Sequence, residues 1–219
     1  MRTRIFLVRH GETTSAAEDR FAGSTDVELA ETGRRQARAL GRRLAHEALA
    51  VAYTSPMTRT RETARLILDG RDVETTVVPE LREIDHGQWE GKSKDEVRRM
   101  WTEEFRAWEA DPFTFAPSGG ETGLEVLNRA LPRLLAIAER HVGASVLVVS
   151  HKATIRLLVG HLLGFALRGF RDRLGQDPCA LNVLDVQRGG EARLLLFNDV
   201  SHYEDLPGPV GSRLSPRWP

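Results

Sequence analysis

The chain has 219 residues, with 31 basic and 31 acidic side chains, so its formal net charge at neutral pH is zero. This balance predicts no nucleic acid or membrane partner, and no apolar run has the length of a membrane span. The single cysteine, Cys179, cannot form an intramolecular disulfide, which fits a reducing compartment. These properties predict a soluble protein of the cytoplasm.

Apolar runs of strand length alternate with amphipathic helical segments along the chain. Strands are expected at residues 5–8, 50–53, 75–78 and 146–149, and helices at about 31–48, from 55 onward, 121–141 and 152–163. The last two strands, 181–186 and 193–197, flank a glycine turn and predict a hairpin. This order predicts an α/β fold: a three-layer αβα sandwich whose mostly parallel central sheet has an antiparallel C-terminal edge.

Two segments depart from this alternation. Residues 92–120 are rich in aromatic and charged side chains, and we expect a helix followed by a mobile cover that shapes the site. The tail, residues 204–219, holds four prolines and is expected to be disordered. Residues 1–203 are therefore expected to form a single domain.

An arginine and a histidine stand together in the motif Arg9-His10-Gly11-Glu12, which directly follows the first apolar strand. Gly11 is expected to allow a sharp turn where that strand ends. The strand at 146–149 also delivers a histidine, His151, at its carboxyl end. Open α/β sheets bind ligands at this edge, so the two histidines are expected to face each other across one cleft if their strands are neighbours.

These residues suit attack on a phosphate. A neutral His10, with its other N–H held by a backbone carbonyl, would form a phosphohistidine. Arg9 would grip the oxyanion, and Arg59 would add its charge in the first turn of a helix that starts with Ser55 as N-cap and Pro56. His151 would contact a second phosphoryl oxygen, best as imidazolium. This positive charge makes a metal or another cofactor unnecessary.

Glu83 is the expected acid. It lies in the loop 79–91, and a partly apolar setting beside Ile84 and Trp89 would let its carboxyl keep a proton for the leaving group. The resulting carboxylate would then activate water.

Each of these residues also has an ordinary interpretation. Arg59 alone fits a solvated helix surface, Glu83 alone fits an exposed loop charge, and the first motif alone fits a surface turn. Two other functions are open: a non-catalytic module that binds a phosphorylated partner, and a hydrolytic metal site built from His10, His151 and the Asp85-His86 pair. The joint placement of the residues at element ends favours phosphoryl transfer.

With these motifs the chain resembles the histidine phosphatase superfamily, which includes cofactor-dependent phosphoglycerate mutases and broad-specificity phosphatases. The matches follow the family's order over most of the chain: residues 7–13, Phe21, Gly23, Asp26, Leu29, Gly33, 53–56, Arg59, Thr63, Ala64, 81–84, Gly87, 89–91, 119–121 and 149–151. The closing residues 198–202 are similar to the bacterial phosphatase branch.

The resemblance implies that His10 is phosphorylated, that Glu83 donates the proton, and that Arg9, Arg59 and His151 line the phosphate pocket. We also expect substrate contacts from Thr13, Gly23 and Lys152.

Two positions depart from the family. Ser15-Ala16 replaces a Trp-Asn pair, so Ala16 cannot supply the amide that normally contacts the phosphoryl group. Lys152 replaces a glycine after the second histidine. Lys152 either points to solvent or adds a cationic contact to an acidic substrate. Lys152 and Arg156 are one helical turn apart, and together they would suit a carboxylate or a second phosphate.

The spacing of the motifs favours a hydrolase over a mutase. Only 67 residues separate Glu83 from His151, which resembles the shorter phosphatases. We therefore predict a metal-independent phosphatase, a monomer or homodimer, that hydrolyses small acidic metabolites such as sugar phosphates or phosphoglycerate derivatives. A phosphoglycerate mutase is the alternative.

Overall fold

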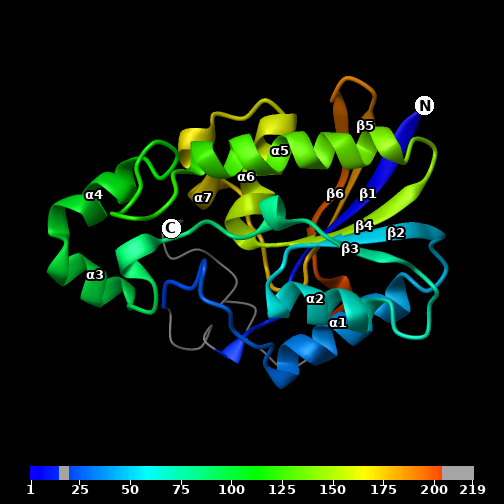
Figure 1. The fold of residues 1–219 in the computed structure, drawn as a ribbon, viewed down its shortest axis with the longest axis horizontal. Coiled ribbons are helices and arrows are strands. Elements are labelled where there is room, and N and C mark those ends of the chain that lie inside the picture. Colours follow the sequence, from blue (N-terminus) through cyan, green and yellow to red (C-terminus); the bar gives the residue numbers. More distant parts are fainter. Residues whose placement is uncertain (15–19, 204–219) are drawn as a thin grey trace.

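A six-stranded sheet forms the centre of the computed structural model, which describes residues 1–14 and 20–203 (Figure 1). Its strand order is β3-β2-β4-β1-β5-β6. Four strands are parallel, namely β1 (Arg2–Arg9), β2 (Leu49–Thr54), β3 (Thr75–Val77) and β4 (Ser145–Ser150), whereas β5 (Leu181–Gln187) and β6 (Ala192–Asp199) are antiparallel to their neighbours. The predicted sheet and hairpin are confirmed. The expectations for Ala16 and for the tail fall outside the described residues.

Helices cover both faces of the sheet, as predicted for a three-layer sandwich (Figure 1). Successive residues of β1 point to opposite faces, so Ile5 and Leu7 enter one core and Phe6 and Val8 the other. The first core includes residues of α5 (Gly123–Arg140), α6 (Lys152–Leu162) and α7 (Phe170–Arg173), and the second those of α1 (Glu31–Arg43) and α2 (Thr58–Ile67). No helix in the described part of the chain is long and apolar enough to cross a bilayer.

Two predicted helix boundaries are wrong. Helix α1 ends at Arg43, and Ala48, expected inside it, is exposed just before β2. Helix α2 begins at Thr58 with Met57 as N-cap, not with Ser55 and Pro56. The reason is that the Ser55 hydroxyl bonds to His151 and Thr60. A carboxylate from another loop, Asp26, accepts the Thr58 N–H at 2.9 Å instead.

The segment 92–120 contains two helices rather than one, α3 (Lys94–Met100) and α4 (Thr102–Ala110), which lie at the opposite end of the molecule from the N-terminus (Figure 1). A capping box between Ser93 and Glu96 starts α3. Val97 and four aromatic side chains form a third, separate cluster, the aromatic members being Phe21, Trp89, Phe105 and Trp108. Phe105 and Trp108 thus pack the cover against Phe21 and Trp89, which lie outside it. That this segment also shapes the site stays a prediction.

Short 3-10 turns complete the fold: η2 (Pro79–Leu81), η3 (Gly87–Trp89), η4 (Leu167–Gly169) and η5 (Ser201–Tyr203). Leu124 is 43% exposed at the start of α5.

Candidate active site

The two histidines meet at the carboxyl edge of the sheet. Strands β1 and β4 are parallel neighbours in which Arg9 lies opposite Ser150, and the His10 N–H donates to the Ser150 carbonyl at 3.0 Å. The imidazole rings of His10 and His151 are 5.2 Å apart between centroids, inclined at 61°. Their predicted meeting across the sheet edge is confirmed.

The turn after His10 needs glycine for a different reason than expected. Gly11 does not have a positive φ. A Cβ at Gly11 would instead lie 2.6 Å from the Gly33 carbonyl oxygen, so a side chain has no room. The turn is also held by side chains of the adjacent helices, since the Gly11 N–H donates to Thr63 Oγ1 and the Glu12 N–H to Gln36 Oε1.

One ring nitrogen of His10 is available as a nucleophile. Nδ1 lies 2.7 Å from the Gly11 carbonyl oxygen. Because a carbonyl only accepts, Nδ1 carries the proton and Nε2 keeps its lone pair. Burial, followed by the charges of Arg9 and Arg59, lowers the pKa of His10 well below its ordinary value, so the ring is neutral near pH 7.

His151 is also neutral in this arrangement. Arg59 Nε donates to His151 Nδ1 at 3.3 Å, and His151 Nε2 lies 2.7 Å from Ser55 Oγ. A guanidinium is always protonated, so Nδ1 is the acceptor and Nε2 the donor. Burial, then His10 and Arg59, lower the pKa of His151 well below its ordinary value. The imidazolium expected for His151 is therefore not its form in the free site.

Arg59 is a buried scaffold for this edge rather than a solvated helix charge. Its side chain is 1% exposed, and its terminal nitrogens donate to the carbonyls of Gly23 and Thr25, both at 2.8 Å. A Cβ at Gly23 would lie 1.8 Å from the Ile84 carbonyl oxygen. Gly23 thus acts through close backbone approach and through its bond to Arg59.

Glu90 organises the loop that holds Arg59, and the sequence assigned it no role. Its carboxylate accepts the backbone N–H groups of Gly23, Ser24, Thr25 and His86. Burial opposes its charge, but these bonds and the Thr25 hydroxyl outweigh burial and lower the pKa of Glu90. The only signal in the sequence was its place in the family motif Trp89-Glu90-Gly91.

Arg9 and Thr13 lie near His10 in different settings. Arg9 Nη1 donates to the Gln176 carbonyl at 2.7 Å, whereas its buried Nε has no hydrogen-bond partner among the described residues. Thr13 is buried and pairs with Leu29 in an isolated bridge.

Glu83 lies against the start of α6. Its carboxylate oxygens accept the N–H groups of Ile84, Ala153 and Thr154 at 3.0–3.2 Å. The Thr154 hydroxyl is 3.2 Å from Glu83 Oε1 and 2.8 Å from the Arg82 carbonyl. The setting is thus polar, in contrast to the partly apolar loop expected from Ile84 and Trp89, which point into separate cores.

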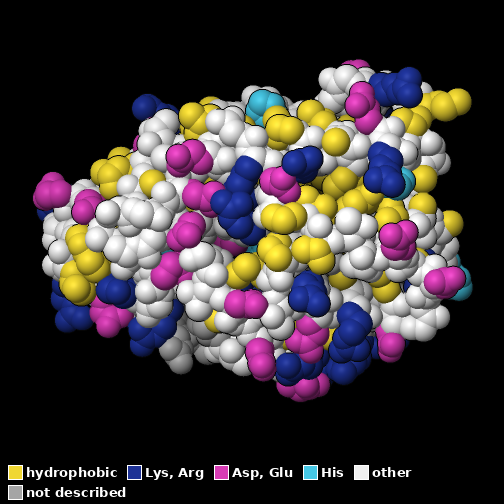
Figure 2. All heavy atoms as spheres, viewed as in Figure 1, with side chains coloured by type: hydrophobic (Ala, Val, Ile, Leu, Met, Phe, Trp, Pro, Cys, Tyr) yellow, Lys and Arg dark blue, Asp and Glu magenta, His cyan; other side chains and the backbone are white. Residues whose placement is uncertain are grey.

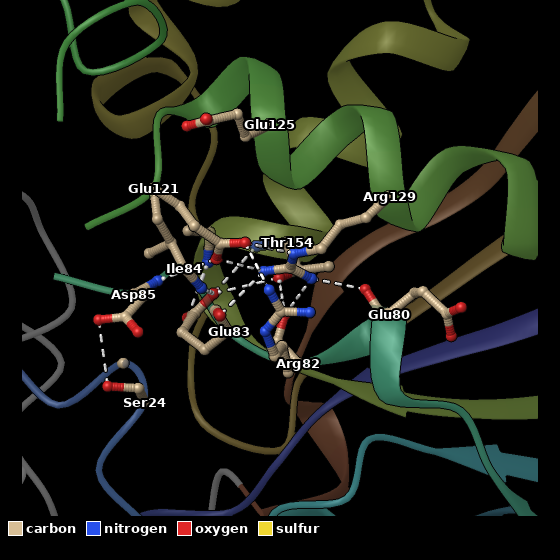
Figure 3. A network of polar contacts seen from close by, with 12 residues as sticks. Ser24, Glu80, Arg82, Glu83, Ile84, Asp85, Glu121, Glu125, Arg129 and Thr154 are labelled. Carbon is tan, nitrogen blue, oxygen red and sulfur yellow. Dashed lines mark hydrogen bonds and ion pairs between the residues drawn. The ribbon is translucent and has the colours of Figure 1, made fainter. Parts of the chain in front are cut away.

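A clamp from α5 fixes the loop that carries Glu83 (Figure 3). Arg129 donates to three backbone carbonyls of that loop, those of Glu80, Arg82 and Glu83, the last at 2.9 Å. It also pairs with Glu121 at 2.8 Å, and Glu121 accepts the Asp85 N–H. Sequence reasoning missed Arg129; the only signal is a charged residue on a helix face that is otherwise buried.

Lys152 and Arg156 lie on α6 next to His151. Lys152 is exposed at the first position of the helix and Arg156 is half-buried. Although Lys152 is exposed as a residue, desolvation by the groups around it, followed by the charges of Arg9, Arg156 and Lys94, lowers its pKa to about 7. Desolvation and Arg9 lower the pKa of Arg156 to about 10.

The metal alternative has no support in the described part of the chain, which contains no group of three or more His, Cys, Asp or Glu placed to hold an ion. The ring of His86 packs against that of Phe21, with 4.8 Å between the ring centroids. Asp85 accepts bonds from Ser24 and Gly87.

An α/β sheet with a neutral imidazole, two guanidiniums and a carboxylate at one edge fits the class of enzymes that form a phosphohistidine. Residues 5–200 match the histidine phosphatase superfamily (branch 1), and the chain belongs to this family. Its members use phosphohistidine chemistry on small phosphorylated metabolites.

Individual relatives include both hydrolases and mutases. Phosphoserine phosphatase 1 of Hydrogenobacter thermophilus is 35% identical over 84% of this chain and 87% of its own length. A 2,3-bisphosphoglycerate-dependent phosphoglycerate mutase of Mesorhizobium japonicum is 34% identical over 75% of this chain and 83% of its own. The solved structure of Bacillus stearothermophilus YhfR is 36% identical, with a TM-score of 0.88 over 92% of this chain and 100% of that one.

Proposed function

We propose that this protein hydrolyses small phosphomonoesters through a phosphohistidine on Nε2 of His10. The observation that carries the proposal is the hydrogen bond from His10 Nδ1 to the Gly11 carbonyl, which leaves Nε2 unprotonated beside His151. Neutral His10 needs no base to activate it, so the enzyme is ready for attack at neutral pH.

In the first step, His10 Nε2 forms a bond to phosphorus as the ester P–O bond breaks. Arg9 and Arg59 stabilise the negative charge of the transferring group. The bound anion also favours uptake of a solvent proton by His151 at Nδ1, because a nearby negative charge stabilises an imidazolium; this proton returns to solvent when phosphate leaves. The new Nδ1–H of His151 then donates to a phosphoryl oxygen, and the hydrogen bond that Nδ1 accepts from Arg59 in the free site is lost.

Glu83 supplies a proton to the leaving oxygen in that step. The Thr154 hydroxyl suits both forms of Glu83: it accepts from the protonated carboxyl while donating to the Arg82 carbonyl, and can donate to the carboxylate afterward. In the second step, the Glu83 carboxylate takes a proton from water, the water oxygen bonds to phosphorus, and the P–N bond breaks. Phosphate leaves, and both His10 and Glu83 return to their starting states.

We propose net hydrolysis rather than isomerisation, since a mutase must keep the phosphohistidine from water while its substrate reorients. The short stretch between Glu83 and His151 supports this choice. We further propose that the enzyme acts in the cytoplasm as a monomer or homodimer on dissolved substrates. On the face in Figure 2, basic and acidic side chains are interspersed, which agrees with small substrates rather than a polyanion.

The test is to incubate the enzyme with 3-phosphoglycerate and follow inorganic phosphate and 2-phosphoglycerate together. Phosphate should appear faster, and quenching during turnover should trap an acid-labile, alkali-stable phosphate on His10. Faster isomerisation would show a mutase. Turnover without a phosphorylated His10 would contradict the mechanism itself.

A further inference from the structure

Two cations next to the proposed phosphoryl site lack a close ion pair with any described residue, although the charges of Glu83 and, for Arg156, Asp172 act on them from farther away. Neither Lys152 nor Arg156 makes an ion pair or a side-chain hydrogen bond with a described residue, and Arg156 Nε is buried with no partner there. Other partly buried arginines are paired, such as Arg129 with Glu121 and Arg34 with Glu62. A buried N–H group without an acceptor is costly, so Arg156 Nε needs an explanation.

The position of the pair adds to that cost. Lys152 is the first residue of α6, where the helix dipole already places positive charge, and a cation there is unfavourable. Arg9 lies near enough to lower the pKa values of both Lys152 and Arg156. Three cations therefore repel one another beside His151, and a bound anion would relieve this repulsion.

A second unsatisfied group lies close by. Gln176, whose carbonyl accepts Arg9 Nη1, is 3% exposed. Both polar atoms of its side-chain amide are buried without a partner in the described residues. Such a donor and acceptor are rarely left unused in native proteins. Through its carbonyl, Gln176 is in direct contact with Arg9.

We propose that Lys152 and Arg156 form a subsite for a second anionic group, so that the preferred substrates are phosphomonoesters that also carry a carboxylate or a second phosphate. The two residues are one helical turn apart on the same face of α6, which lets both contact one anion. This inference rests on the proposed function, because the first phosphoryl group must be held at His10.

The test compares substrates that differ only in the second group. 3-Phosphoglycerate and glycerol 3-phosphate share a three-carbon skeleton, with a carboxylate in one and a hydroxymethyl group in the other. Fructose 1,6-bisphosphate and fructose 6-phosphate differ by a second phosphate. The ratio of kcat/KM within each pair is measured for the wild type, Lys152→Met and Arg156→Met, with Arg65→Met, an exposed charge on α2, as the control.

The proposal predicts that the wild type prefers at least one anionic member. Each site variant should lower that preference by about ten- to a hundredfold, mainly through KM, as expected for loss of a charge-assisted hydrogen bond. Arg65→Met should keep the wild-type ratio. Which pair responds distinguishes a carboxylate from a second phosphate. Equal losses for both members of each pair, or no preference in the wild type, would overturn the subsite.

Binding to the His10→Ala variant separates the two proposals. Titration calorimetry with 3-phosphoglycerate, glycerol 3-phosphate and the two fructose esters requires no turnover. Tighter binding of an anionic member, lost when Lys152→Met is added, supports the subsite even if the wild type releases no phosphate. Phosphate release with no difference in affinity within either pair supports the hydrolase and rejects the subsite.

Discussion

The two halves of the site reach their positions in different ways. His10 and His151 lie at the ends of adjacent parallel strands, and the backbone ladder between β1 and β4 sets their separation. Glu83 lies in a loop, where contacts from α5 and α6 hold it: Arg129 on the backbone carbonyls, and the N–H groups of Ala153 and Thr154 on the carboxylate.

This difference means that the position of the nucleophile and the position of the acid can be disturbed independently. A strand end in a six-stranded sheet moves only if the sheet core is disrupted. A loop held by a few side-chain contacts, of which Arg129 makes three to its backbone carbonyls, can move after a single distant substitution. Changes in the clamp should therefore weaken proton donation while leaving formation of the nucleophile intact, and the following variants test this separation in order of expected effect.

His10→Ala should give the largest effect, because it removes the atom that bonds to phosphorus. Loss of a nucleophile of this kind lowers turnover by about three or more orders of magnitude. Phosphate release and trapping of the phosphoenzyme are the measurements. His46→Ala, at an exposed histidine just after α1, is the control and should keep full activity. A His10→Ala enzyme with near-normal turnover would remove the basis of the mechanism.

Glu83→Gln should affect substrates according to their leaving group. The amide cannot transfer a proton, so hydrolysis of an alkyl phosphate should fall by about 10²- to 10³-fold. A 2,4-dinitrophenyl ester needs no proton on its leaving group, so phosphorylation of His10 should survive. Stopped-flow should then show a burst of dinitrophenol and accumulation of phosphohistidine, because water is no longer activated. The same loss for both esters, without a burst, would argue against the acid role.

Much of the part of the site at the strand ends, which holds His10 and His151, follows from the sequence alone. Apolar runs ending in histidine predicted β1 and β4 as buried strands, and the glycine turn predicted the β5–β6 hairpin; that β1 and β4 are neighbours comes from the structure. Helix ends were less predictable, since they depend on tertiary contacts. Ser55 has the residue type of an N-cap, but its hydroxyl bonds to His151, 96 positions away. Asp26 satisfies the start of α2 from a separate loop.

The support of Glu83 could not be predicted for the same reason. Arg129 lies 46 positions after Glu83, and no local pattern connects the two. Glu90 likewise acts on Gly23, 67 positions away, and only the family motif marked it. Neutral His151 also depends on a tertiary contact, the donor Arg59. Residue type and periodicity indicate which groups carry chemistry, but protonation and support come from distant partners.

Arg129→Met tests the clamp. Without its bonds the Glu83 loop should loosen, lowering kcat for an alkyl phosphate by about tenfold and the free energy of unfolding by about 2 kcal/mol. The dinitrophenol burst from a 2,4-dinitrophenyl ester, which reports phosphorylation of His10 alone, should slow much less, which a general loss of folding would not produce. Arg133→Met is the matched control one turn along α5: its pair with Glu80 is largely exposed, so about 0.5 kcal/mol or less is expected. Equal kinetic losses for both esters would assign Arg129 a structural role only.

The smallest expected effect is a pH dependence at Lys152. The pKa of Lys152 is lowered to about 7 by desolvation and by Arg9, Arg156 and Lys94, against the opposing charge of Glu83. Lys152 is therefore charged below pH 7 and loses its charge as the pH rises through that value. The preference for 3-phosphoglycerate over glycerol 3-phosphate should fall several-fold between about pH 6 and 8.5.

The ratio of the kcat/KM values for the two substrates isolates the titration of Lys152, because both substrates carry a phosphate that ionises in the same pH range. Lys152→Arg is the discriminating variant. Arginine keeps its charge over this pH range, so the ratio of kcat/KM values in this variant should not change with pH. His10 adds no inflection there, because its pKa lies well below its ordinary value. If the wild-type ratio is already flat, or if Lys152→Arg keeps the slope, the charge of Lys152 does not set the preference. The exposed start of α6 would then be merely adjacent to the chemistry at the strand ends.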